Sequence, residues 1–184
     1  MIKKTVLFLV LAIALVIVGF STYTASNWIQ YTSKEGQFQI LFPRAPRHAV
    51  TKLPFRSPSE LVTYDNYVAR GDDETLYLLT TALYPISPDG ENAKAYLEKF
   101  VLQLVTNSRQ NKILKLQHTL FESSPAIDFT LLNKEFWTYG RAIFVGNKMF
   151  ILLVSNFSDA QAQQNFKTFA GSLRLLQDSP SEKK

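Results

Sequence analysis

Two histidines are the side chains whose type is best suited to metal binding or acid–base chemistry. His48 and His118 stand seventy residues apart, and neither has a second ligand at a metal-type spacing. A zinc site needs three or four ligands, usually with a paired spacing. We therefore interpret both as surface or strand-edge histidines, and we predict no metal and no cofactor.

Asp128 is the most interesting acidic residue, because it lies in an alternating segment whose other face is apolar. If the Asp128 face is covered, the carboxylate needs a partner, and Arg141 on the neighbouring strand can supply it. We interpret the two as a structural ion pair. A hydrolase-type enzyme with a site around Asp128, Arg141 and His118 stays open as the alternative.

No catalytic motif accompanies these residues. Ser123 and Ser124 lie beside Glu122, but the sequence contains neither G-x-S-x-G nor S-x-x-K, the patterns of common serine nucleophiles. The seven glycines form no G-x-G-x-x-G or Walker pattern, so nucleotide binding has no support. We predict that the protein is not an enzyme.

A basic segment without acids follows the first hairpin and is broken by three prolines. One interpretation is a solvated loop and an edge strand, where charge prevents aggregation. The other is an anion-recognition surface for phospholipid headgroups or for an acidic protein partner. The candidate residues are Arg44, Arg47, His48, Lys52 and Arg56.

The N-terminus has the pattern of an export signal. Lys3 and Lys4 precede an unbroken apolar run over residues 6–20, which we expect to form a helix in the membrane. Its membrane-segment residues include Val6, Leu9, Ile13, Val16 and Phe20. The cleavage site is poor, so a cleaved signal and an uncleaved anchor both remain open. Either way, we expect residues 1–26 to direct the rest of the chain across the membrane.

Composition limits what the exported part can be. The chain has 184 residues and no cysteine, which excludes disulfides, thiolate nucleophiles and a lipidated cysteine. Removing Lys3 and Lys4 from the 20 basic residues leaves 18 against 15 acidic ones, a net charge of +3. This excess is too small to indicate nucleic acid binding. We predict one domain over residues 27–176 and a disordered polar tail over 177–184.

Alternation of apolar residues predicts many antiparallel strands. Residues 28–42 form a hairpin with Gly36 at the turn and Pro43 at its end. Further strands are expected at 47–53, 61–69, 75–84, 113–121, 126–132, 137–145 and 149–155. The segment at 75–84 is apolar on both faces, which is typical of a strand in the middle of a sheet covered on both sides.

Two segments have helical spacing and can supply this cover. In the first, the apolar stripe is Ala93, Leu97, Phe100, Val101 and Leu104. The second begins with a capping box, in which Ser158 is answered by Gln161. Its stripe is Ala162, Phe166, Phe169 and Leu173. The predicted fold class is α+β, an antiparallel sheet covered by helices, preceded by the N-terminal apolar helix.

The order of these motifs resembles that of the PsbP-like domains. The matching stretches are FQILFPRAP at 38–46, Tyr64 and Tyr67, GRAIFVGNKMFILLV at 140–154 and FKTFAGSL at 166–173. The resemblance covers nearly all of residues 28–176 and implies an α-β-α sandwich. The family includes an extrinsic subunit of photosystem II, a nuclear Ran-binding protein and many uncharacterised exported bacterial proteins, and the likeness to this last group is greatest.

These observations favour a non-catalytic binding or accessory domain of an envelope complex. We expect it to be exported, and anchored in the cytoplasmic membrane facing the periplasm or exterior, or secreted if the signal is cleaved. The expected partners are the membrane, through the N-terminal segment, and an envelope protein or anionic lipid, with no nucleic acid. Besides the hydrolase, a carrier of small apolar ligands remains as an alternative, which requires a cavity between helix and sheet.

Overall fold

The computed structural model describes residues 28–55, 57, 59–85, 87, 90–106 and 110–176. The expected membrane segment, Arg56 and the tail at 177–184 lie outside the described residues. The elements, in chain order, are β1 (Ile29–Ser33), β2 (Phe38–Phe42), β3 (Arg47–Pro54), β4 (Leu61–Arg70), β5 (Leu76–Leu83), α2 (Gly90–Thr106), β6 (Asn111–Phe121), β7 (Ser124–Asn133), β8 (Phe136–Val145), β9 (Lys148–Asn156), α3 (Asp159–Gly171) and β10 (Arg174–Leu175).

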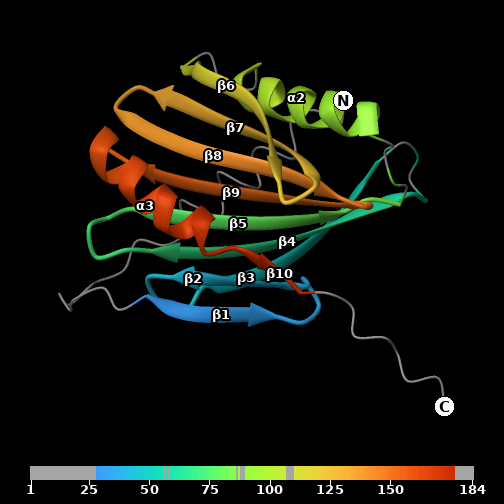
Figure 1. The fold of residues 1–184 in the computed structure, drawn as a ribbon, viewed down its shortest axis with the longest axis horizontal. Coiled ribbons are helices and arrows are strands. Elements are labelled where there is room, and N and C mark those ends of the chain that lie inside the picture. Colours follow the sequence, from blue (N-terminus) through green and yellow to red (C-terminus); the bar gives the residue numbers. More distant parts are fainter. Residues whose placement is uncertain are drawn as a thin grey trace.

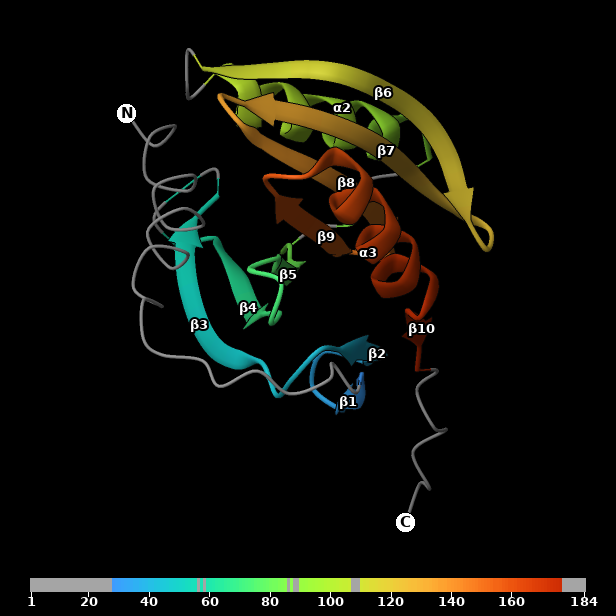
Figure 2. The ribbon, with the colours of Figure 1, turned by 90° about the vertical axis from the view of Figure 1, so that its left-hand side faces the viewer.

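A large antiparallel sheet forms the body of the domain (Figure 1). Its seven strands run in the order β3-β4-β5-β9-β8-β7-β6, and a smaller sheet has the order β1-β2-β10. The short turns after β4, β6, β7 and β8 place consecutive strands side by side, as antiparallel pairing requires. Figure 2 shows the large sheet curving from β3 round to β6. The predicted α+β class with an antiparallel sheet is confirmed.

Side-chain alternation gives the large sheet two apolar faces. On one face, α2 packs with Ile127 and Phe129 of β7 and with Ala142 and Phe144 of β8. We call this the α2 face. The other, the α3 face, carries a second cluster in which Tyr77 and Leu79 of β5 and Leu152 of β9 contact α3 and the small sheet. Each strand in the middle of the sheet contributes alternate residues to the two clusters.

Strand β5 lies where the sequence predicted, in the middle of the sheet, but one residue departs from the prediction. Tyr77 and Leu79 are almost completely buried on the α3 face, and Ala82 is buried on the α2 face. Leu83, however, is 43% exposed, because β5 ends there. The hydrophobic cover of the α3 face therefore stops before Leu83, whereas Tyr84, the next residue, packs on the α2 face.

The first hairpin is also confirmed, and its turn depends on Gly36. The backbone N–H of Gly36 donates to Ser33 Oγ at 2.9 Å. A Cβ at this position would lie 2.5 Å from the ring of the buried Phe38. The sequence pattern did not predict β10, a strand of two residues that pairs with Gln39 and Phe38 of β2 and joins the end of the domain to its beginning.

The two helices bury most of each predicted stripe, and Leu173 is buried just after α3 has ended at Gly171. In α2 the four aliphatic members are buried, while Phe100 is only partly buried. In α3 Phe166 is partly buried, whereas Asn165, which was not predicted, is buried. Ser158 Oγ accepts from Gln161 N, as the N-cap prediction requires. The reciprocal half of the capping box is absent, because the Gln161 side chain donates to Asn165 and Ser158 N donates to Asn156.

Candidate binding surface

Asp128 and Arg141 form the predicted ion pair on the α3 face. They stand directly opposite each other in the β7–β8 register. Arg141 Nε donates to Asp128 Oδ1 at 2.6 Å, and Nη2 donates to Oδ2 at 2.8 Å. These hydrogen bonds raise the pKa of Arg141, with partial burial opposing and the charge of Asp128 adding to the effect. Both carboxylate oxygens are therefore engaged by the guanidinium.

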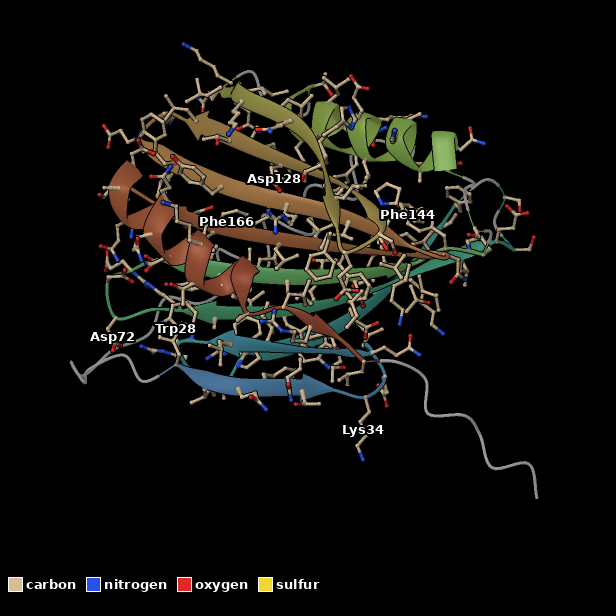
Figure 3. The ribbon with its side chains drawn as sticks, in the orientation of Figure 1. Trp28, Lys34, Asp72, Asp128, Phe144 and Phe166 are labelled. Carbon is tan, nitrogen blue, oxygen red and sulfur yellow. The ribbon has the colours of Figure 1, made fainter. Side chains whose placement is uncertain are left out.

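This pair lies beyond the cover that α3 gives to the sheet. The helix packs on β8, β9 and β2, while Asp128 belongs to β7. Figure 3 shows Asp128 on the sheet away from the axis of α3. The side chains of Asp128 and Arg141 are 30% and 24% exposed. The two charges thus neutralise each other, and the pair is partly accessible to solvent beside the area that α3 covers.

His118 lies on the opposite face of the sheet. It stands opposite Ile127 in the β6–β7 register, and Ile127 belongs to the α2-face cluster. The His118 ring points to α2, where its Nε2 is 3.9 Å from Glu98 Oε2. Because successive residues of a strand point to opposite faces, His118 cannot join a site with Asp128 and Arg141. The single hydrolase site proposed as an alternative is therefore wrong in its geometry.

Two of the five basic candidates are paired with acidic side chains. Arg44 forms an ion pair with Asp72 in the turn after β4. His48 Nε2 lies 3.0 Å from Asp65 Oδ1, and its ring stacks on Tyr67 with centroids 4.4 Å apart. Each of these contacts holds β3, or the loop before it, to β4 or to the turn that follows β4. They support a structural role for Arg44 and His48.

Arg47 and Lys52 are separated in space. Arg47 stands opposite Val68 and Lys52 opposite Thr63, so their side chains point to different faces of the sheet. Five residues of strand also set their backbones roughly 16 Å apart. Both are exposed, and no described acidic residue lies within 4.0 Å of either head group. The four described candidates of the basic segment therefore do not form one continuous patch.

A buried polar network, which sequence reasoning missed, ties the β4–β5 turn to the start of α3. Thr75 Oγ1 accepts from Asn156 Nδ2 at 2.6 Å and from Asn165 Nδ2 at 2.9 Å. Asn165 Nδ2 also donates to Asp73 Oδ2, and Asn156 Nδ2 donates to the Asp73 carbonyl. The available signal was Asn165, an amide beside the apolar stripe of a helix. Its partners are 90 and 92 residues away, a separation that no local pattern reveals.

An exposed aromatic pair, also missed, lies at the same end of the sheet. The rings of Phe136 and Phe157 have centroids 4.0 Å apart and are tilted by 35°. Phe136 is 43% exposed and Phe157 is 53% exposed. They begin β8 and follow β9, two strands that are paired here through Trp137 and Asn156. The two rings together form an exposed apolar contact between the start of β8 and the segment after β9.

The described chain begins at this end as well. The Trp28 ring packs edge-on against Tyr77, the second residue of β5, with centroids 5.3 Å apart. Leu76, the first residue of β5, pairs with Ser155 near the end of β9. We call the region with Trp28, the β4–β5 turn and the two phenylalanines the Trp28 end. The opposite Lys34 end carries the β1–β2 turn, where Lys148 Nζ donates to the Gly36 carbonyl (Figure 3).

Two kinds of site are not found in the described part of the chain. Those residues contain no group of three or more histidine and acidic side chains arranged to hold a metal ion. None of the described helices has the length and hydrophobicity needed to cross a bilayer.

Comparison with solved structures identifies the architecture. The solution structure of cyanobacterial PsbP (CyanoP) from Synechocystis sp. PCC 6803 superposes with a TM-score of 0.52. The match covers 86% of this chain and 98% of that chain. The fold is PsbP-like. Sequence identity to CyanoP is 13%, so the similarity resides in the arrangement of the strands and helices.

Sequence comparisons add no closer relative. No protein-family model matches the chain, and no curated protein matches it. The PsbP-like fold inferred from the aromatic, glycine and proline positions in the sequence thus agrees with the structural match.

Proposed function

We propose that the chain is an exported, membrane-tethered binding domain of the PsbP-like α-β-α sandwich type, without catalytic activity. The proposal covers residues 27–176 as the folded unit, with residues 1–26 as signal or anchor and 177–184 as a tail. It assigns the domain to the periplasmic or exterior side of the cytoplasmic membrane. There it assists the assembly or stability of an envelope complex.

The dispersal of the candidate reactive groups carries the non-catalytic part of this proposal. Asp128 is engaged by Arg141 on one face, and His118 lies beside Glu98 on the other. General acid–base catalysis needs such groups within hydrogen-bond reach of one substrate. The alternative of an apolar-ligand carrier stays a prediction without a supporting observation.

The basic segment has a narrower role in this proposal than the sequence predicted. Arg47 begins β3 beside Val68, two residues before the end of β4, and therefore lies at the Trp28 end. Among the described candidates of the basic segment at this end, it is the one left to meet an anionic headgroup or an acidic partner, because Arg44 and His48 already contact carboxylates. Lys52 lies towards the Lys34 end, where its charge protects the edge strand from aggregation.

Membrane fractionation of the full-length chain tests the tether. Expressed in a bacterial host, the protein should remain with the membranes after an alkaline carbonate wash. It should also be digested by protease added to spheroplasts. A Leu9→Lys/Ile13→Lys variant should lose membrane retention, because lysine in the apolar run makes insertion unfavourable, whereas a Leu9→Ile/Ile13→Leu control should keep it.

The alternative outcomes separate the parts of the proposal. Release of a shortened chain to the outside would contradict the tether and leave export intact. A full-length chain that is protected from protease in spheroplasts, and is washed off the membrane by carbonate, would contradict both.

A further inference from the structure

Phe136 and Phe157 form an exposed aromatic contact on the surface of the Trp28 end. Each ring is about half exposed, although side chains of this size contribute most of their stabilisation when buried. The two rings touch each other and come from different elements, the start of β8 and the segment between β9 and α3. They are held by the pairing of Trp137 with Asn156 next to them.

The position of this pair relative to the beginning of the domain indicates its occupant. Trp28 packs on Tyr77 of β5, and two strand spacings separate β5 from β8 in the sheet order. The two strands are therefore roughly 10 Å apart. Trp28 lies on the α3 face, and Phe136, which stands an even number of positions before Phe144 on β8, lies on the α2 face at the same end of the sheet. The seven residues at 21–27 join Trp28 to the apolar run, and fully extended they reach at most about 24 Å. A bilayer that holds the apolar run is therefore close to the Trp28 end.

We propose that Phe136 and Phe157 insert into the interfacial layer of the bilayer that holds residues 6–20, and so orient the domain with its Trp28 end on the membrane. This inference rests on the proposed tether. Phenylalanine is among the side chains that membrane-surface segments bury at the boundary between headgroups and acyl chains. Insertion buries two exposed rings, at an end of the domain where Arg47 is available to meet anionic headgroups.

Site-specific fluorescence in vesicles tests the orientation. Because the chain has no cysteine, a single cysteine can be labelled without removing others. Glu135→Cys places an environment-sensitive dye beside Phe136 on the β7–β8 turn, and Lys34→Cys places it at the opposite end. Each full-length variant is reconstituted into phosphatidylcholine vesicles, with and without phosphatidylglycerol, and floated to isolate the bound protein.

The dye at position 135 should show blue-shifted emission and quenching by lipids with nitroxide groups, while the dye at position 34 should behave as in water. Adding Phe136→Ser and Phe157→Ser should abolish the shift and the quenching at position 135. The matched control Leu102→Ser, at an exposed apolar position of α2, should leave both unchanged. A shift that needs phosphatidylglycerol and disappears with Arg47→Glu alone would assign the contact to headgroup charge and overturn the role of the rings.

Different results would contradict the proposed orientation and the proposed tether. If the chain floats with the vesicles but the two labels report the same aqueous environment, the inserted pair is wrong and the tether stands. If the chain does not float, the tether is wrong, and the orientation is overturned with it. A pair covered by a protein partner would give the first of these results in vesicles made of lipid alone.

Discussion

The two faces of the large sheet are covered by different means. The α2 face is closed by one helix, whose buried residues among those described are Ala93, Leu97, Val101 and Leu104. This face also contains ring contacts, in which Tyr84 and Tyr96 lie against Phe144. The α3 face is closed by a helix and by the small sheet, and its core is rich in aromatic rings, with Phe38, Phe42, Tyr67, Tyr77 and Phe169 in contact. Rings therefore occur on both faces, and the faces differ in what covers them: one helix on the α2 face, and a helix together with the small sheet on the α3 face.

Each covered face also contains buried polar contacts. On the α2 face, Thr80 Oγ1 donates to Asn66 Oδ1 at 2.8 Å. Buried hydrogen bonds join Thr75, Asn156 and Asn165 on the α3 face, and they fix the start of α3 against the β4–β5 turn. This contact fixes α3 over β8 and β9, and the Asp128–Arg141 pair remains partly exposed beside the helix. The covered faces provide stability, and the surfaces left for binding are the ends and margins of the sheet.

Truncating the core on each face should give the largest effects. Phe169→Ala removes a completely buried ring from the α3 face and should cost about 3–5 kcal/mol of unfolding free energy. Leu97→Ala on the α2 face should cost about 2–5 kcal/mol. Phe166→Ala is the control, because this ring is only partly buried and should cost less than Phe169→Ala. Urea melts give these values, and equal losses for the two phenylalanines would contradict the placement of α3.

Removing the polar tie should have the next largest effect. Thr75→Val keeps the shape of the side chain but removes the oxygen that accepts from Asn156 and Asn165. We expect a loss of about 1–3 kcal/mol, because two buried amide donors lose a partner. Thr119→Val, on a partly buried position of β6, should change stability by much less. If the two valine variants were equally stable in urea melts, the network would not fix α3.

The Asp128–Arg141 pair should contribute less, because it is partly exposed. A double-mutant cycle with Asp128→Asn and Arg141→Gln should give a coupling energy of about 1 kcal/mol, above a typical surface pair only through its bidentate geometry. The coupling should weaken in high salt. Absence of coupling at low salt would show that the two side chains do not interact in solution.

The smallest effect concerns Tyr139, whose hydroxyl donates to Asp159 Oδ1 at 2.6 Å at the start of α3. Burial, and then the hydrogen bond and the charge of Asp159, raise the pKa of Tyr139 to about 12 from an ordinary value of 10.0. Since the folded state holds this proton more tightly, the stabilisation is complete below pH 10 and is lost as the pH rises towards 12.

Tyr139→Phe removes this group and should therefore flatten the dependence of stability on pH in that range. The comparison is the difference in unfolding free energy between wild type and variant at successive alkaline pH values. A difference that stays constant through the range would contradict the raised pKa.

The local features of the fold were predictable from the sequence because each depends on neighbouring residues. Gly36 marks the first turn, Ser158 caps α3, and the alternation around Asp128 predicts both its face and its partner Arg141. The aliphatic stripe of α2 also follows from helical spacing. In these cases the pattern and the structure agree.

Features that depend on distant contacts were not predictable. The basic segment is continuous in the sequence, but strand alternation places Arg47 and Lys52 on different faces of the sheet. Arg44 and His48 are paired with Asp72 and Asp65. Asn165 gave no sign of partners in the β4–β5 turn. Phe136 and Phe157 stand 21 positions apart in the sequence and meet only because β8 pairs with β9.

The central claim is that the domain lies outside the cytoplasmic membrane with its Trp28 end against the bilayer. The most direct test labels intact spheroplasts with a membrane-impermeant maleimide, using Lys34→Cys and Glu135→Cys in the full-length chain. Both cysteines should react quickly after detergent is added. Without detergent, we predict fast labelling at position 34 and much slower labelling at position 135. No labelling at position 34 before lysis would contradict export, and equal rates at both positions would contradict the orientation on the membrane.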